Sequence, residues 1–361
     1  MIRSALALTA LTVSTGVAQA GGIDRSGTPI DIIFEEGNYA TLSYGYADPS
    51  LTGVDQEGAN VRNIAASFGL VGVALKLDIA ENVSLAFILD EPYGVDVEYG
   101  PESAVLGGTL ADAESYGITT LVRYQATDRI SVYGGPRFVR AKGQINLGGS
   151  AYFLDGYESN FASDTGTGYV IGAAYEIPDI AFRAALTYHS EIDLSFDTTE
   201  TFLGVPVPTG TTNTTLPQSI KLAVQSGIAT DTLVFGSVRW VDHDVFMVIP
   251  PVFPENLASL DSSITYELGI GRRFSERFSA RASVIYEDVL ADDLVSPLTP
   301  TSGFTALSIG GQYQLTEALD ISGGIRYTWL KDATAEVSDS VVGEFRNNDV
   351  VSFGLKLGVR F

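Results

Sequence analysis

The last eleven residues alternate strictly between apolar side chains and small or polar ones, and no other feature of the sequence restricts the fold as much. The apolar positions are Val351, Phe353, Leu355, Leu357, Val359 and Phe361. A period of two puts these side chains on one face of a β-strand. An apolar face, a polar face and a terminal Phe are typical of the closing strand of an outer-membrane β-barrel. The last strand of a soluble β-sandwich is the alternative.

The N-terminus predicts export from the cytoplasm. Arg3 precedes an apolar stretch over residues 5–17, which ends in Ala18-Gln19-Ala20. A charged start, a short apolar middle and small residues before a cleavage point are typical of a secretory signal peptide, predicted here over residues 1–20. No later run of about 18 apolar residues could form a transmembrane helix, so a membrane role would require strands.

The same alternation recurs along the whole chain after the signal peptide. Strands are expected near residues 39–46, 62–79, 83–97, 113–125, 130–146, 168–177, 180–197, 215–228, 232–247, 261–274, 277–287, 302–314, 318–330 and 346–361. Short turns alternate with long loops rich in Gly, Pro, Asp, Ser and Thr, and in outer-membrane barrels the long loops face outward. We therefore predict an all-β fold, one transmembrane antiparallel β-barrel of about 14 strands over residues 38–361.

Composition excludes several function classes. The formal net charge is −23, which opposes binding to phosphate backbones, so nucleic acid is not an expected partner. The chain has no cysteine, which excludes Cys-ligated zinc and a thiol nucleophile. No phosphate-binding loop, metalloprotease motif or calcium loop occurs, so no metal and no cofactor are expected.

Several segments, taken in order, resemble the FadL-type long-chain fatty-acid transporters, a family that also includes importers of aromatic hydrocarbons. These segments are LKLDIAENVSLAFILDEPYG (75–94), FVRAKG (138–143), YHSEID (188–193), Leu216-Pro217 with its strand, and SVRWVDHDVF (237–246). The resemblance implies a fourteen-stranded barrel in the bacterial outer membrane. It also implies passive transport of long-chain fatty acids or other small hydrophobic molecules, an N-terminal hatch in the lumen, and a side opening at a kink in the third strand.

The sequence offers candidates for both gating parts. Residues 21–37 precede the first strand and are expected to fold inward as the hatch, with Ile32, Ile33 and Phe34 filling the lumen. This segment is shorter than the family's hatch and lacks its Asn-Pro-Ala. In the third strand, Pro92 and Gly94 should weaken the ladder and open a gap. An ordinary strand end before an external loop is the alternative.

A fatty-acid carboxylate needs a buried cation, because an unpaired buried charge is costly. Strand periodicity points Arg281, Arg326 and Arg137 into the lumen. Arg140 resembles the position from which the family holds the carboxylate, but periodicity places it on the lipid face unless a bulge near residues 134–136 reverses the strand. A structural salt bridge in the lumen is the alternative role for each cation.

Catalysis is not expected. In Asp242-His243-Asp244, adjacent strand residues would point to opposite faces, and no nucleophile-elbow motif accompanies the histidine. The other expected partners are outer-membrane lipid, lipopolysaccharide, and the barrel-assembly machinery through Phe361. A general porin for small polar solutes is the alternative function; it would require an open charged constriction in place of a plugged lumen.

Overall fold

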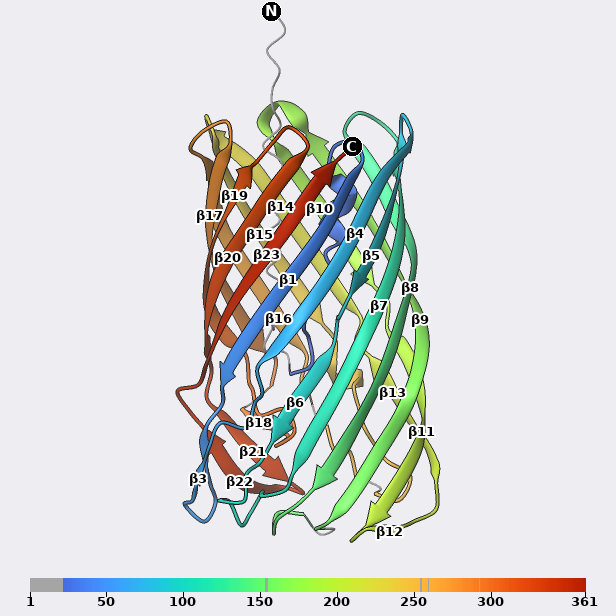
Figure 1. Ribbon diagram of the computed structural model, residues 1–361, viewed down its shortest axis with the longest axis vertical. Helices are drawn as coiled ribbons and strands as arrows, with labels where there is room; N and C mark the ends of the chain where they lie inside the picture. Colours follow the sequence, from blue (N-terminus) through green and yellow to red (C-terminus); the bar gives the residue numbers. More distant parts are fainter. Residues whose placement is uncertain (1–21, 153–154, 254, 259, 292) are drawn as a thin grey trace, which may run out of the picture.

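The computed structural model describes residues 22–152, 155–253, 255–258, 260–291 and 293–361, and the expected signal peptide lies outside them. The chain forms a closed antiparallel barrel (Figure 1). Closure occurs where β1 (Tyr39–Ser50) pairs on one side with β4 (Phe68–Ala80) and on the other with β23 (Asp349–Arg360). The predicted all-β barrel of 14 strands is confirmed.

Eleven of the fourteen barrel strands are continuous. Besides β1, β4 and β23 they are β7 (Leu110–Gln125), β8 (Ile130–Leu147), β9 (Tyr157–Ile177), β15 (Thr232–Val241), β16 (Ser263–Arg273), β17 (Phe278–Val289), β19 (Phe304–Gln314) and β20 (Leu319–Leu330). Three are broken in two: β5 (Val83–Asp90) with β6 (Gly94–Glu98), β10 (Phe182–His189) with β11 (Ile192–Phe202), and β13 (Gly210–Leu216) with β14 (Ser219–Ala229). β12 (Val205–Pro206) extends the hairpin that begins at β11.

The outer wall is apolar, as the alternation predicts. In β23 the side chains of Phe353 and Leu355 are exposed, whereas the intervening Ser352 faces the lumen and is buried. The chain ends at the rim of short turns, which in such barrels faces the periplasm (Figure 1). At the opposite rim, loops form a second small sheet from β2 (Gly53–Asp55), β3 (Asn60–Val61), β18 (Leu294–Val295), β21 (Ala333–Val337) and β22 (Ser340–Phe345).

Two sequence predictions for the extracellular half are wrong. Residues 157–166 and 198–202 were expected in loops but continue β9 and β11, because their polar outer side chains project into water above the membrane and keep the strand period. The other error is the orientation of β11: unbroken alternation from Leu186 would put Leu194 and Phe196 on the outer face, but they face inward, whereas Asp193 is exposed. The break at Ser190-Glu191, between β10 and β11, reverses the alternation.

Within the described residues, helical structure is limited to three short turns of 3₁₀-helix: η1 (Ile30–Phe34), η2 (Pro178–Ile180) and η3 (His243–Val245). None of the helices in the described residues is long and apolar enough to cross a membrane. η1 belongs to the segment of residues 22–37, which lies inside the barrel ahead of β1 and is called the hatch segment below (Figure 1).

Candidate functional site

The hatch segment fills the lumen with apolar side chains. Ile32, Ile33 and Phe34 are all buried in a cluster with the inner faces of β4, β5 and β7. The ring of Phe34 meets Tyr133 edge to face at 5.4 Å, and the guanidinium groups of Arg123 and Arg183 lie 4.8 and 4.4 Å from its centre. Cation–π contacts of this kind strengthen when they are shielded from water.

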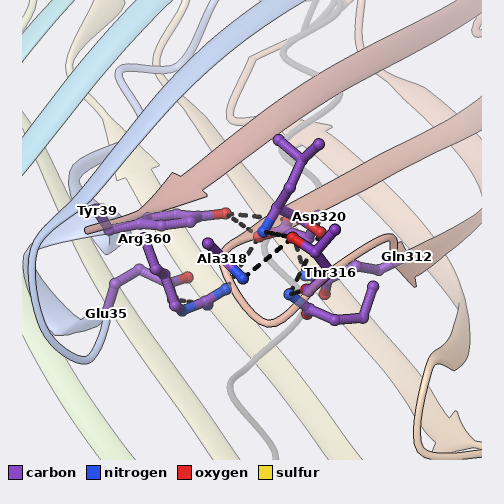
Figure 2. A network of polar contacts seen from close by, with 9 residues as sticks. Glu35, Tyr39, Gln312, Thr316, Ala318, Asp320 and Arg360 are labelled. Carbon is purple, nitrogen blue, oxygen red and sulfur yellow. Dashed lines mark hydrogen bonds and ion pairs between the residues drawn. The ribbon is translucent and has the colours of Figure 1, made fainter.

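A polar network ties the C-terminal end of the hatch segment to the barrel seam (Figure 2). Arg360 of β23 contacts Glu35 and Asp320, each at 3.0 Å. The Tyr39 hydroxyl also donates to Asp320, which is fully buried. Burial raises the pKa of the Glu35 carboxyl above its usual value. The network therefore fixes one end of the hatch segment where the first and last strands meet.

The other end of the hatch segment pairs with the break in the third strand. The ladder between β4 and β5 stops at the pair Val73–Leu89. Beyond the break, the segment ahead of β4 contacts β6 through an isolated bridge between Ala65 and Val97. Across the break, Arg25 N–H donates to the Pro92 carbonyl, and Gly94 N–H donates to the Ile23 carbonyl, both at 2.8 Å.

Side chains reinforce this contact. Asp90, at the end of β5, accepts hydrogen bonds from Ser26 at 2.5 Å and Thr28 at 2.8 Å. The Arg25 side chain lies over the ring of Phe68 and across Gly94, where a Cβ would come within 2.5 Å of its Nε. Gly94 therefore makes room for the hatch segment. Pro92 is buried beside it, so the strand resumes after the break and does not simply end.

An apolar chamber lies in the extracellular half of the barrel, next to the break. It holds about 790 Å³, including space open to solvent, and its exposed wall is almost wholly apolar. Its lining includes Ile23, Tyr93, Phe161, Leu194, Phe196 and Phe246. The inward Leu194 and Phe196 come from the reversed part of β11, so the break at residues 190–191 helps to make the chamber apolar.

A second cavity opens at the periplasmic rim. It holds about 2090 Å³, including space open to solvent, and its wall is charged, with Arg123 paired to Glu176. Phe34 lines this cavity, whereas Ile23 lines the apolar chamber. The hatch segment therefore lies between the two.

The structure separates the four predicted ligand-binding arginines. Arg137 is buried in the lumen, where it donates to Thr28 at 3.1 Å and lies 5.5 Å from the centre of the Tyr93 ring. Arg140 is on the outer surface, where it donates to Ser163 at 2.7 Å. No register shift occurs at residues 134–136, so the suggested inward turn of Arg140 is wrong.

Arg281 and Arg326 face the lumen on another part of the wall. Arg281 lies 5.7 Å from the centre of the Phe235 ring, and its electrostatic partners are Glu267 and Asp31 of the hatch segment. Arg326 interacts with the same glutamate and with Arg281. Neither arginine lines the apolar chamber.

Sequence reasoning missed two basic residues that contact the hatch segment. Arg239 of β15 contacts Asp24 of the hatch segment at 2.7 Å, and His243 Nε2 lies 3.9 Å from the same carboxylate. Burial alone would raise the pKa of Asp24, but the charges of Arg239 and His243 hold it below its usual value. Periodicity could have placed Arg239 in the lumen, but it could not have matched it with Asp24, 215 residues away.

Asp242 directly precedes η3, and His243 and Asp244 lie in it, so the run is outside any strand and the strand argument against a shared pocket does not apply. The acids nevertheless serve the fold: Asp242 accepts from Gln218 at 2.9 Å and Asp244 from Ser262 at 2.8 Å. Among the described residues, no group of three or more His, Asp and Glu side chains could hold a metal ion.

The apolar outer wall, the short-turn and long-loop rims and the filled lumen define a plugged outer-membrane β-barrel. Residues 38–361 match the family model of the outer membrane protein transport protein (OMPP1/FadL/TodX). The chain belongs to this family, which confirms the resemblance and the outer-membrane location.

Known proteins agree with this assignment. Outer membrane protein P1 of Haemophilus influenzae is 21% identical over 316 residues, covering 76% of this chain and 68% of that protein. A Pseudomonas aeruginosa FadL homologue superposes with a TM-score of 0.75 at 14% identity, over 92% of this chain and 93% of the other. The Pseudomonas putida toluene transporter TodX gives a TM-score of 0.67 at 11% identity, over 96% and 98%. The chain is therefore an outer membrane transport protein of this family.

Proposed function

We propose that the protein carries long-chain fatty acids, or hydrophobic molecules of similar size, passively from the cell surface into the outer membrane through a side opening at residues 91–93. The observation that supports this most directly is the apolar chamber beside a strand break whose edge pairs with the hatch segment. Transfer of apolar surface into the chamber is worth about 25 cal/mol per Å² and needs no energy source.

A general porin is the competing function. It would need a continuous polar path, whereas the hatch segment lies between the chamber and the periplasmic cavity, with its apolar side chains buried. We expect low steady ion conductance in planar bilayers together with saturable binding of a labelled fatty acid. Large steady conductance without saturable binding would favour the porin.

The side opening has its own test. Asp24 and Tyr93 form a non-hydrogen-bonded antiparallel bridge, whose Cα atoms are typically about 4.5 Å apart and suit a disulfide. The native chain has no cysteine, so the D24C/Y93C pair would be the only thiols. We expect transfer of a labelled fatty acid into liposome lipid to stop when the pair is oxidised and to recover on reduction. Equal transfer in both states would exclude this route.

The remaining expected partners follow from the surface. The terminal Phe361 side chain is 67% exposed, and its N–H donates to the Asn38 carbonyl at 3.1 Å. We propose that the assembly machinery recognises this exposed residue, and that the outer wall contacts lipid and lipopolysaccharide. Deleting Phe361 should lower the amount of assembled barrel in the outer membrane, as measured by heat-modifiable gel migration, without changing fatty-acid binding per folded molecule.

A further inference from the structure

The barrel wall between β9 and β11 lacks a ladder over part of its length. β9 pairs with β10 as far as His189 and with β11 only from Thr198 onward. Both ladders keep the same register, which places residues 162–169 of β9 opposite residues 190–197. Among the residues that the structure describes, only one backbone hydrogen bond crosses this region, from the Ser190 N–H to β9. Residues 162–169 and 190–197 are called the unpaired stretch below.

Two side chains take the place of backbone partners in the unpaired stretch. The Ser190 hydroxyl accepts a hydrogen bond from the Tyr169 N–H at 2.9 Å, and the Asp164 carboxylate accepts one from the Ser195 N–H at 2.7 Å. The first contact lies next to the β9–β10 ladder, and the second lies closer to the extracellular rim. A side chain therefore holds the two strands together near each end of the stretch.

Apolar packing closes the middle of the unpaired stretch. The Ile192 side chain is 1% exposed and lies against Gly166 and Gly168, where an added Cβ would collide with it. Glycine at both positions therefore makes room for a side chain that lies between the strands. Strands joined by a ladder expose unpaired N–H and C=O groups when they separate, whereas strands joined by such packing separate without breaking a ladder.

The unpaired stretch lies in front of the apolar chamber. Leu194 and Phe196 line the chamber from the β11 side, and Phe161 lines it from β9. On the outer surface, the rings of Tyr169 and Tyr188 pack at 5.9 Å at the lower end of the stretch. Such aromatic pairs mark the membrane interface in outer-membrane barrels. Only the packing between the two strands therefore separates the chamber from the outer surface of the membrane at this level.

The unpaired stretch is separate from the break in the third strand. Residue pairing leads from Asp90, at the end of β5, through Gly117 of β7 and Val139 of β8 to Gly166. β7 and β8 lie between the two interruptions (Figure 1), and both strands line the chamber. The chamber therefore lies behind a section of wall that has an interruption at each edge.

We propose that the unpaired stretch is the entrance of the chamber: a long apolar chain at the outer surface of the membrane passes between β9 and β11, where Ile192 now packs on the two glycines. Apolar chains concentrate at the membrane surface because their exposure to water is unfavourable, so an entrance at this level takes them up without a passage through water. This inference rests on the proposed function and adds where the ligand enters.

The test bridges the unpaired stretch covalently in the full-length protein in nanodiscs. Thr165 and Ser195 are exposed on the two sides of it, and the native chain has no cysteine, so a bifunctional thiosulfonate would join T165C to S195C alone. Binding of a dansyl-labelled fatty acid is followed by stopped-flow fluorescence. We expect the bridge to slow association and dissociation at least about tenfold each while Kd stays within about twofold, because a blocked entrance changes both rates by the same factor. Reduction of the bridge should restore both rates.

E158C/T201C is the matched control. This pair joins the same two strands above the unpaired stretch, where Glu158 and Thr201 are opposed in an intact ladder. Its bridge should change either rate less than about twofold. Unchanged rates after bridging T165C/S195C would overturn the inference, and so would equal slowing in E158C/T201C, which would indicate general stiffening of the barrel. If the wild-type protein does not bind the probe saturably, the proposed function itself fails; saturable binding with rates that ignore the bridge overturns the entrance alone.

Discussion

Phe34→Ala should unplug the barrel. Phe34 is buried and contacts Tyr133, Arg123 and Arg183 with its ring. Truncating a buried Phe to Ala costs about 3–5 kcal/mol, to which the two cation–π contacts contribute. At the lower figure of about 3 kcal/mol, the ratio of docked to undocked hatch falls roughly 150-fold.

The assay is steady conductance in planar lipid bilayers at equal protein insertion. The wild type should show rare brief openings, and F34A should show long-lived open states, because the chamber and the periplasmic cavity become continuous. F274A is the matched control, since Phe274 is 64% exposed and lies outside the hatch contacts. Equal open probability in F34A and the wild type would refute the view that the hatch segment plugs the lumen.

Three further predictions concern the same site. F196E should weaken hydrophobic-probe binding at least about tenfold in a fluorescence titration, because it buries a charge in the chamber. G94V should expose the hatch segment to added protease, because its side chain would collide with Arg25; a protected hatch would contradict this. Docking should weaken as the pH falls below 3.8 in hydrogen-exchange measurements of residues 22–37, and unchanged protection there would contradict the role of Asp24. Asp24 has a lowered pKa, so its contribution is present above 3.8 and is lost as the pH falls below that value.

Much of the fold could be predicted because the barrel repeats one rule. Alternation with period two identified fourteen strands and the lipid face of β23, where Phe353 and Leu355 are exposed. The rule fails where a strand is interrupted and the alternation between inward and outward side chains reverses. Two residues, Ser190 and Glu191, reverse β11, and a break of that length leaves no signal in composition. Unbroken alternation would therefore place Leu194 and Phe196 of the chamber lining on the lipid face.

The site was harder to predict than the fold, because it depends on pairs that are distant in sequence. Strand periodicity correctly placed Arg137 in the lumen. The family resemblance suggested Arg140 as the residue that holds the carboxylate, but Arg140 lies on the outer surface. The contact between Asp24 and Arg239 joins the hatch segment to the ninth barrel strand. Nothing local to either residue indicates the other, so the position of the hatch had to be known first.

Photolabelling with a diazirine-bearing fatty acid, followed by mass spectrometry of the labelled peptides, tests the central claim most directly. If the ligand passes through the apolar chamber and out at the strand break, the label should appear on residues 93–95 and 194–196, and excess unlabelled fatty acid should remove it. Label confined to the periplasmic cavity, or spread over the lipid-facing wall without competition, would contradict the account.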